Sequence, residues 1–432
     1  MLFALFFGAG NLIFPAAMGQ TAGVNTWWAV LGFCITGVGL PLLGIIAVGY
    51  SGCRDLREVA SRVHPFFGLF YTVVCYMAIG PCFAIPRTGT VSYEIAVRPF
   101  LGAEPSVLAL PLFLAAFLGF SCWLAASPSK LVDRIGKYLT PALLITLAIM
   151  IVMSFVAPMG DFQAAGAAYG DPVKAAVQGV LDGYNTLDAI AALVFSTLIV
   201  NSVKDIGFTD PKTISSQVAR AGILAGSLLG LVYIFIAKIG AESVGVIGLQ
   251  ETGAPVLAES AKVLFGSFGA HLLAAIVLLA CITTAVGLLT CCAAFFMQLT
   301  GKFTYVQWVV GFTIISYLIG LFGLKTIIVS TIPVLMFIYP LCVALIALIF
   351  LHKFFDGRQC VYAWTMAFTF VMALINGAET AGVSMAGLEE VLKAYVPLHT
   401  LGLGWIPFAV VGFVVGLVWK AMVPAKSQVV AA

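Results

Sequence analysis

The feature that most constrains this chain is a series of continuous apolar runs, each about 20 residues long. An α-helix needs about 20 apolar residues to cross the hydrocarbon core of a membrane. A membrane β-barrel would instead alternate apolar and polar residues over segments of about 10 residues. The sequence therefore predicts an all-α polytopic membrane protein.

Too few residues could face water for the chain to be soluble. Of its 432 residues, 62% are hydrophobic and 9% are charged, whereas a soluble domain carries about 25% charged residues. This composition excludes a soluble enzyme, a nucleic-acid-binding protein and a disordered scaffold. The net charge of +3 gives no reason to expect a polyanion. The expected partners are membrane lipid and a small molecule, and nothing indicates an obligatory protein partner.

The apolar runs, and the Pro, Gly and charged residues that separate them, predict about twelve transmembrane helices in one domain, residues 1–432. Most of the 21 Lys and Arg residues fall on one side of the membrane when the N-terminus is placed inside. Cytoplasmic loops retain positive charge, so we expect both termini in the cytoplasm. The predicted spans are approximately 1–19, 27–49, 66–93, 106–125, 138–157, 185–203, 218–239, 269–298, 305–323, 326–351, 361–376 and 402–420.

The first run contains a pattern that can interrupt a helix. Gly8 and Gly10 bracket a point where the helix can unwind, Asn11 follows, and Pro15 removes one more backbone donor. A broken membrane helix exposes carbonyl groups on one side and amide groups on the other, which suits a cation and a carboxylate. The alternative is a face of small residues that packs against another helix. We favour the break.

A second break is expected where the sixth run opens. Asn185, Thr186 and Asp188 stand together there, and the alternative is a surface helix capped by Asp188. The two expected breaks lie five helices apart in spans of opposite direction, as in transporters built from inverted repeats. We predict repeats at about 1–157 and 185–351, with trailing helices at about 361–420.

Two further groups of polar residues lie within apolar spans. Thr283 and Thr284, one turn after Ala280, could bind Na⁺ through their hydroxyl groups together with a carbonyl group, although threonine hydroxyls often bond to their own helix instead. Arg87 and Glu94 are seven residues apart, nearly on one helix face. They could form an outer gate, or Arg87 could contact a substrate carboxylate. Arg87 could equally extend toward the membrane interface.

Other function classes have no support in the sequence. No His lies in the middle of a span, and no nucleophile–base set or metal cluster is visible, so we do not expect an enzyme. The pattern G-x-x-x-x-G-K-[ST], which binds nucleoside triphosphates, is also missing. A channel would show a pore loop or rings of ligands. The ten cysteines are expected to pack as small apolar residues.

Several segments resemble the branched-chain amino acid carrier family, known as BrnQ or LIVCS, in order along essentially the whole chain. The similar segments are Leu5–Pro15, Gly80–Glu94, Gly183–Val194, Thr284–Gly287 with Cys291 and Cys292, and Ile332–Pro340. The short N-terminus departs from the family, and we expect the first membrane helix to start upstream of Met1 or to be truncated.

The resemblance implies a LeuT-like fold of five plus five inverted helices, with helices 1 and 6 broken. It implies a symporter in the bacterial cytoplasmic membrane that imports leucine, isoleucine and valine with Na⁺. Coupling to H⁺, and an amino acid sensor that no longer transports, remain as alternatives. By this resemblance, the substrate ligands are Gly8, Ala9, Gly10, Asn11, Thr186 and Asp188. The Na⁺ ligands are Ala4, Phe7, Ala280, Thr283 and Thr284.

Overall fold

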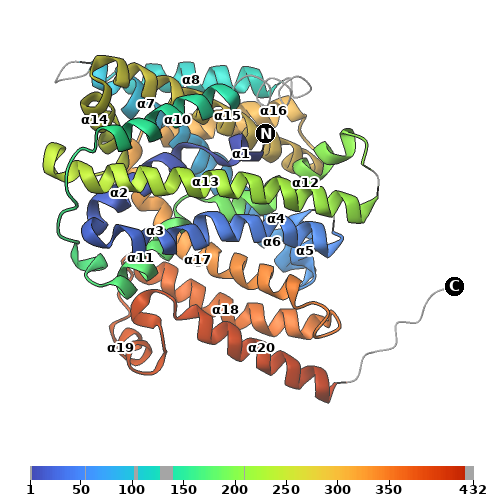
Figure 1. Cartoon of the computed structure of the whole chain (residues 1–432). Coiled ribbons are helices and arrows are strands. Elements are labelled where there is room, and N and C mark those ends of the chain that lie inside the picture. Colours follow the sequence, from blue (N-terminus) through green and yellow to red (C-terminus); the bar gives the residue numbers. More distant parts are fainter. Residues whose placement is uncertain (1, 54, 102–105, 127–139, 209, 424–432) are drawn as a thin grey trace. The chain divides into compact units, whose positions relative to one another are not determined.

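A computed structural model describes residues 2–53, 55–101, 106–126, 140–208 and 210–423. Throughout these ranges the chain consists of helices and connecting segments, without a β-strand (Figure 1). The α-helices are α1 Leu2–Phe6, α2 Ala9–Ala22, α3 Thr26–Cys34, α4 Leu40–Ser51, α5 Leu56–Ser61, α6 Pro65–Met77, α7 Ala84–Ala96, α8 Ala109–Ala125, α10 Thr140–Val156, α11 Pro172–Tyr184, α12 Asp188–Asp205, α13 Pro211–Ile247, α14 Gly253–Phe265, α15 Ser267–Thr300, α16 Tyr305–Gly320, α17 Leu324–Phe350, α18 Gln359–Thr380, α19 Ala386–Tyr395 and α20 Trp405–Met422.

The packing of these helices divides the chain into two compact units. The first unit comprises Met1–Gly49 and Val74–Ile332, and the second comprises Tyr50–Val73 and Pro333–Ala432. In the first unit α2 packs against α13 and α14, α3 against α11, and α15 against α7. In the second unit α18 packs against α20. The boundaries of the two inverted repeats stay a prediction.

Helices α2 and α13 approach each other at backbone distance. A Cβ added to Gly19 of α2 would lie 2.0 Å from the Ala237 carbonyl oxygen, and one added to Gly240 of α13 would lie 2.2 Å from the Ala16 carbonyl oxygen. Because real Cβ atoms do not come this close, only glycine allows the crossing. This contact fixes the first broken helix against the long helix α13.

Each of the twelve predicted spans contains helix in its described part, although several predicted ends, such as 106–108 and 402–404, lie outside the helices. Residue 1 of the first span and residues 138 and 139 of the fifth lie outside the described residues. Within the described ranges, seven helical stretches are long and apolar enough to cross a membrane. They are Ala9–Ser51, Pro65–Phe100, Ser216–Ile247, Ser267–Thr300, Leu324–Phe350, Gln359–Thr380 and Trp405–Met422. Helices α8 and α16 are apolar but shorter.

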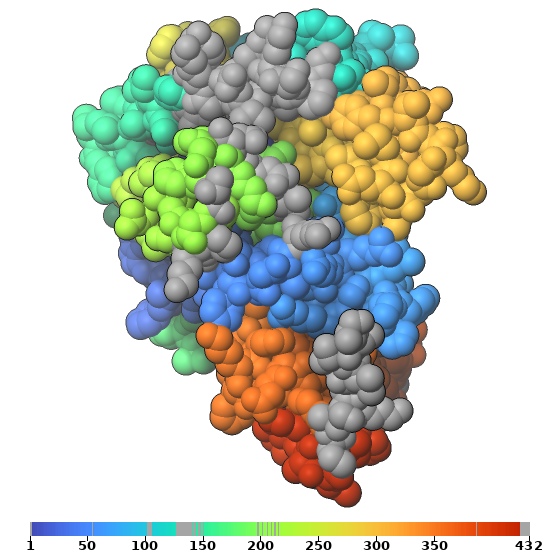
Figure 2. Space-filling view, turned by 90° about the vertical axis from the view of Figure 1, so that its right-hand side faces the viewer, coloured from blue at the N-terminus to red at the C-terminus, as the bar shows by residue number. Residues whose placement is uncertain are grey.

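The surface of α16 fits a lipid environment. Val306, Val310, Ile314 and Leu318 recur every four residues on this helix, and each is about half exposed. The side view shows this part of the chain, coloured yellow-orange, at the surface (Figure 2). An apolar stripe of this kind would be costly in water, whereas in a bilayer it faces lipid chains.

The first predicted span consists of two helices that meet at a break. Helix α1 ends at Phe6 and α2 begins at Ala9. Between them Gly8 is extended, with φ −129° and ψ −162°. The break falls at the position expected from the glycines, one residue before the second helix starts.

A second break lies where the sixth predicted span, 185–203, begins, so the predicted start at residue 185 falls between two helices and not at the start of one. Helix α11 ends at Tyr184, and α12 begins at Asp188 after Leu187, whose φ of 67° is left-handed. The residues predicted to open the span are the break itself. Helix α11 carries Lys174, Gln178 and Asp182 along its length, so its sequence does not read as an apolar run.

Candidate functional site

The break in the first helix is held open by one side chain. In a continuous helix the Gly8 amide would donate to the Ala4 carbonyl. Instead it donates to Asn11 Oδ1 at 2.9 Å. The last carbonyl groups of α1 therefore lack partners within their own helix. Asn11 thus makes α1 carbonyl groups available to other ligands.

Two hydroxyl groups of α15 contact a carbonyl group of α1 and one at the break that follows it. Thr283 Oγ1 lies 3.3 Å from Ala4 O, and Thr284 Oγ1 lies 3.3 Å from Phe7 O. Thr283 Oγ1 also lies 2.8 Å from Ala280 O of its own helix. All five residues predicted as Na⁺ ligands therefore come together, although 276 positions separate the two groups in the sequence (residues 4 and 280).

This cluster suits a small hard cation. Its ligand atoms are all oxygen, which such cations prefer. The Ala4 carbonyl lies in the last turn of α1 and the Phe7 carbonyl directly after it, where the helix dipole favours positive charge. The residues present thus fit Na⁺, which would be carried across the membrane rather than retained.

A buried carboxylate lies at the second break. Asp188, at the first position of α12, is 2% exposed. Its Oδ2 accepts hydrogen bonds from Asn11 Nδ2 at 2.5 Å and from the Tyr233 hydroxyl at 2.8 Å. Asn11 Nδ2 also donates to the Tyr233 hydroxyl oxygen. Asn11 therefore connects both broken helices and α13.

Arg87 reaches the same place from α7. Its Nη1 donates to the Asn185 carbonyl at 2.7 Å and its Nη2 to the Thr186 carbonyl at 3.4 Å. The guanidinium carbon lies 5.1 Å from the centre of the Phe14 ring. Glu94, two turns further along α7, interacts electrostatically with Arg98. The Arg87 side chain thus contacts the second break. An outer gate formed by Arg87 and Glu94 stays a prediction.

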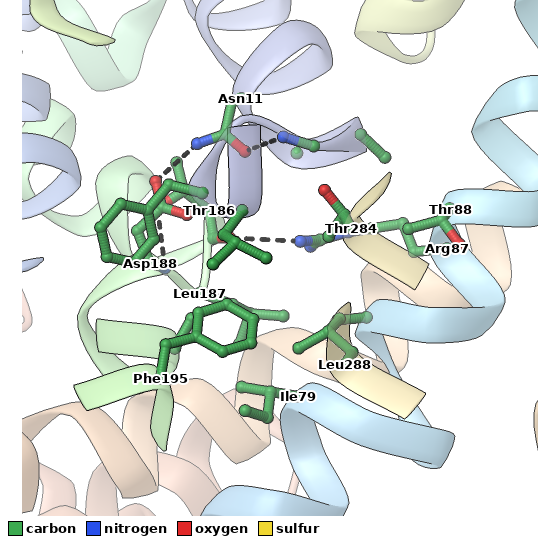
Figure 3. Close-up of a pocket in the computed structure, with 17 residues that line it drawn as sticks. Asn11, Ile79, Arg87, Thr88, Thr186, Leu187, Asp188, Phe195, Thr284 and Leu288 are labelled. Carbon is green, nitrogen blue, oxygen red and sulfur yellow. Dashed lines mark hydrogen bonds between the residues drawn. The ribbon is translucent and has the colours of Figure 1, made fainter. Parts of the chain in front are cut away.

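A small cavity lies between the two breaks, and every residue predicted as a substrate ligand lines it. Polar groups occupy one side and apolar side chains the other, as Figure 3 shows for Ile79, Phe195 and Leu288. Thr284 borders both this cavity and the oxygen cluster. The residues around the cavity are Leu5, Phe6, Gly8, Ala9, Gly10, Asn11, Ile79, Ala84, Arg87, Thr88, Thr186, Leu187, Asp188, Ala191, Phe195, Thr284 and Leu288.

Sequence reasoning missed part of this site. Tyr233 was not singled out, although a polar atom within an apolar helix is a signal that could have found it. Phe195 and Leu288 carry no such signal, because each stands in an apolar run like its neighbours. Only the three-dimensional arrangement identifies them as cavity residues.

Comparison with known proteins places the chain in a family. A family model described as branched-chain amino acid transport protein matches residues 1–423. The branched-chain amino acid permease BraB of Bacillus subtilis is 43% identical over 99% of this chain and 96% of its own length. The permease BrnQ of the same organism is 42% identical over 97% of this chain and 94% of its own length.

Solved structures of transporters share the fold. Mhp1, a nucleobase–cation symport-1 family transporter in a closed conformation with bromovinylhydantoin, superposes with a TM-score of 0.66 at 14% identity, covering 98% of this chain and 90% of Mhp1. MhsT in complex with L-phenylalanine superposes with a TM-score of 0.58 at 16% identity, covering 96% of both chains. The predicted LeuT-like fold is confirmed, and the chain belongs to the branched-chain amino acid transport protein family, whose members are transporters and not enzymes.

Proposed function

We propose that this protein is a symporter that carries leucine, isoleucine and valine into the cell together with Na⁺. The observation that carries the proposal is the position of Thr284, which borders both the oxygen cluster and the cavity. A cation at the cluster and a substrate in the cavity would be neighbours there. Each would then strengthen the binding of the other by the same factor.

The cavity suits an amino acid with a branched apolar side chain. Its polar side is formed by the amides at the start of α2 and by Asp188, which fit a carboxylate and an ammonium group respectively. Phe195, Ile79 and Leu288 provide an apolar surface opposite. One methylene in such a pocket is worth about 1–3 kcal/mol, so we expect all three branched substrates to be accepted.

We place the protein in the bacterial cytoplasmic membrane with both termini inside, as the distribution of Lys and Arg indicates. Inward transport then uses the Na⁺ gradient. An H⁺-coupled carrier is the second candidate, because Asp188 is a carboxylate buried at the substrate cavity.

Uptake of labelled leucine into proteoliposomes tests the proposal. An inward Na⁺ gradient at equal pH should stimulate uptake, and unlabelled valine and isoleucine should compete. Stimulation by a pH gradient alone would replace Na⁺ by H⁺ as the coupling ion. Specific leucine binding without uptake under either gradient would favour a sensor over a carrier.

A further inference from the structure

Arg87 stands out because its charge is buried at the cavity and has no part in the proposed Na⁺ cluster. Its side chain is 3% exposed. Burying a guanidinium in a membrane protein is costly, and such groups concentrate where they serve function.

The guanidinium joins the two helix breaks. Nη1 and Nη2 bond the carbonyl groups of Asn185 and Thr186, which follow the C-terminal end of α11. Nη2 also lies against the first turn of α2, since a Cβ added to Gly10 would meet it at 2.7 Å. Arg87 is thus held in place on one break and faces the other.

The start of α2 is also where a carboxylate would bind. The amides of Ala9 and Gly10 lie at the N-terminal end of that helix, where the dipole favours negative charge. Both residues and Arg87 line the same cavity. A substrate carboxylate at these amides would therefore lie beside a fixed positive charge.

The cavity contains an opposite charge as well. Asp188 lines it and interacts electrostatically with Arg87, and Figure 3 shows the two side chains reaching the cavity from different helices. A free amino acid is a zwitterion, with one charge to match each of them. An amine or a 2-oxo acid would leave one of the two charges without its counterpart.

We propose that Arg87 is the cationic ligand of the substrate carboxylate, held in position by the carbonyl groups of the broken sixth helix. This inference rests on the proposed function and adds a residue that selects zwitterionic substrates. A guanidinium suits the role because its planar fork matches the two carboxylate oxygens. Lysine at this position would keep the charge but lose the fork.

The test compares leucine with leucinamide, which keeps the ammonium group and the side chain but lacks the carboxylate. The stabilisation of the purified full-length protein against thermal unfolding, measured with each ligand in Na⁺, gives the two dissociation constants. The variants are Arg87→Gln and Arg87→Lys. The matched control is Arg98→Gln, which removes an exposed guanidinium eleven residues further along the chain.

Wild-type protein should bind leucine at least about 30-fold more tightly than leucinamide, the scale expected for loss of one partner from a buried charge pair. Arg87→Gln should weaken leucine binding by a similar factor and change leucinamide binding little. The leucine affinity of Arg87→Lys should fall between those of the wild type and Arg87→Gln. Arg98→Gln should bind both ligands like the wild type.

Equal weakening of both ligands by Arg87→Gln would overturn the proposal, because it would assign Arg87 a purely structural role. Equal binding of leucine and leucinamide by the wild type would also overturn it, even if no variant folds. In that case leucine still binds and the proposed function stands. Folded wild-type protein that binds neither ligand would overturn the proposed function itself.

Discussion

Asn11 Nδ2 lies 2.5 Å from Asp188 Oδ2, so a single hydrogen bond joins the broken first helix to the broken sixth helix across 177 residues of sequence. The Oδ1 atom of the same side chain accepts a hydrogen bond from the Gly8 amide. One residue therefore opens the first break and links it to the second. Changes at either break should affect the other.

Asn11→Asp should weaken leucine binding strongly. The new carboxylate can still accept the Gly8 amide, but it cannot donate to Asp188 and places a second negative charge beside it. Loss of a buried hydrogen bond to a charged group costs about 1.5–3 kcal/mol, and repulsion adds to this. The dissociation constant for leucine, measured by titration, should rise at least about tenfold. An unchanged constant would show that the link between the breaks has no role in binding.

Thr284→Ala should raise the Na⁺ concentration that gives half-maximal leucine uptake. The substitution removes one of the oxygen atoms near the Phe7 carbonyl. Loss of a residue that only hydrogen-bonds to a metal ligand already changes metal affinity by about 10- to 100-fold. We therefore expect the half-maximal Na⁺ concentration to rise at least about tenfold. Thr300→Ala is the control, since its hydroxyl lies on the same helix and bonds to the Phe296 carbonyl. Equal Na⁺ dependence in the two variants would contradict the assignment of the cluster.

Gly8→Ala tests the same cluster from the other helix. The backbone of Gly8 is allowed for any residue, but the new Cβ would lie 2.8 Å from Thr284 Oγ1. The Thr284 hydroxyl must move, so Na⁺ should bind more weakly. Leucine in the absence of Na⁺ should still fit the cavity. In Gly119→Ala the added Cβ meets no atom within 4 Å. That control should transport normally and gain up to about 1 kcal/mol of stability from helix propensity.

Tyr233→Phe should destabilise the site around Asp188. The carboxylate loses a hydrogen bond of 2.8 Å while it stays buried, at a cost of about 1–3 kcal/mol. Thermal unfolding of the purified variant should occur at lower temperature, and leucine binding should weaken. Tyr395→Phe changes a tyrosine that is 81% exposed and should do neither. If both variants unfold like the wild type, the hydroxyl of Tyr233 contributes nothing to the site.

Phe195→Ala should broaden the range of substrates. The ring contributes to the apolar side of the cavity and is 1% exposed, so its removal leaves space for a larger side chain. Phenylalanine should then compete with labelled leucine more effectively, by about tenfold or more, given about 1–3 kcal/mol per methylene. Phe120→Ala removes an exposed ring and should leave competition unchanged. Equal competition by phenylalanine in both variants would show that Phe195 does not contact the substrate.

The sequence predicted the helical class, the spans and both breaks, because hydropathy and helix-breaking residues are local signals. It placed Asn11 and Asp188 at the two breaks but could not show that they touch. Helix α11 was missed because Lys174, Gln178 and Asp182 interrupt its sequence, so it shows no continuous apolar run. Tyr233 and Phe195 belong to the site only through the packing of α12 and α13 around the first helix, which depends on contacts between distant residues.

The most direct test of the account is the mutual effect of Na⁺ and leucine on purified wild-type protein. The leucine dissociation constant is measured with and without saturating Na⁺, and the Na⁺ dissociation constant with and without saturating leucine. Adjacent sites joined by Thr284 predict that both constants fall by one common factor, and that Thr284→Ala reduces this factor. Leucine binding that is the same with and without Na⁺ would contradict the central claim that the oxygen cluster and the cavity act together.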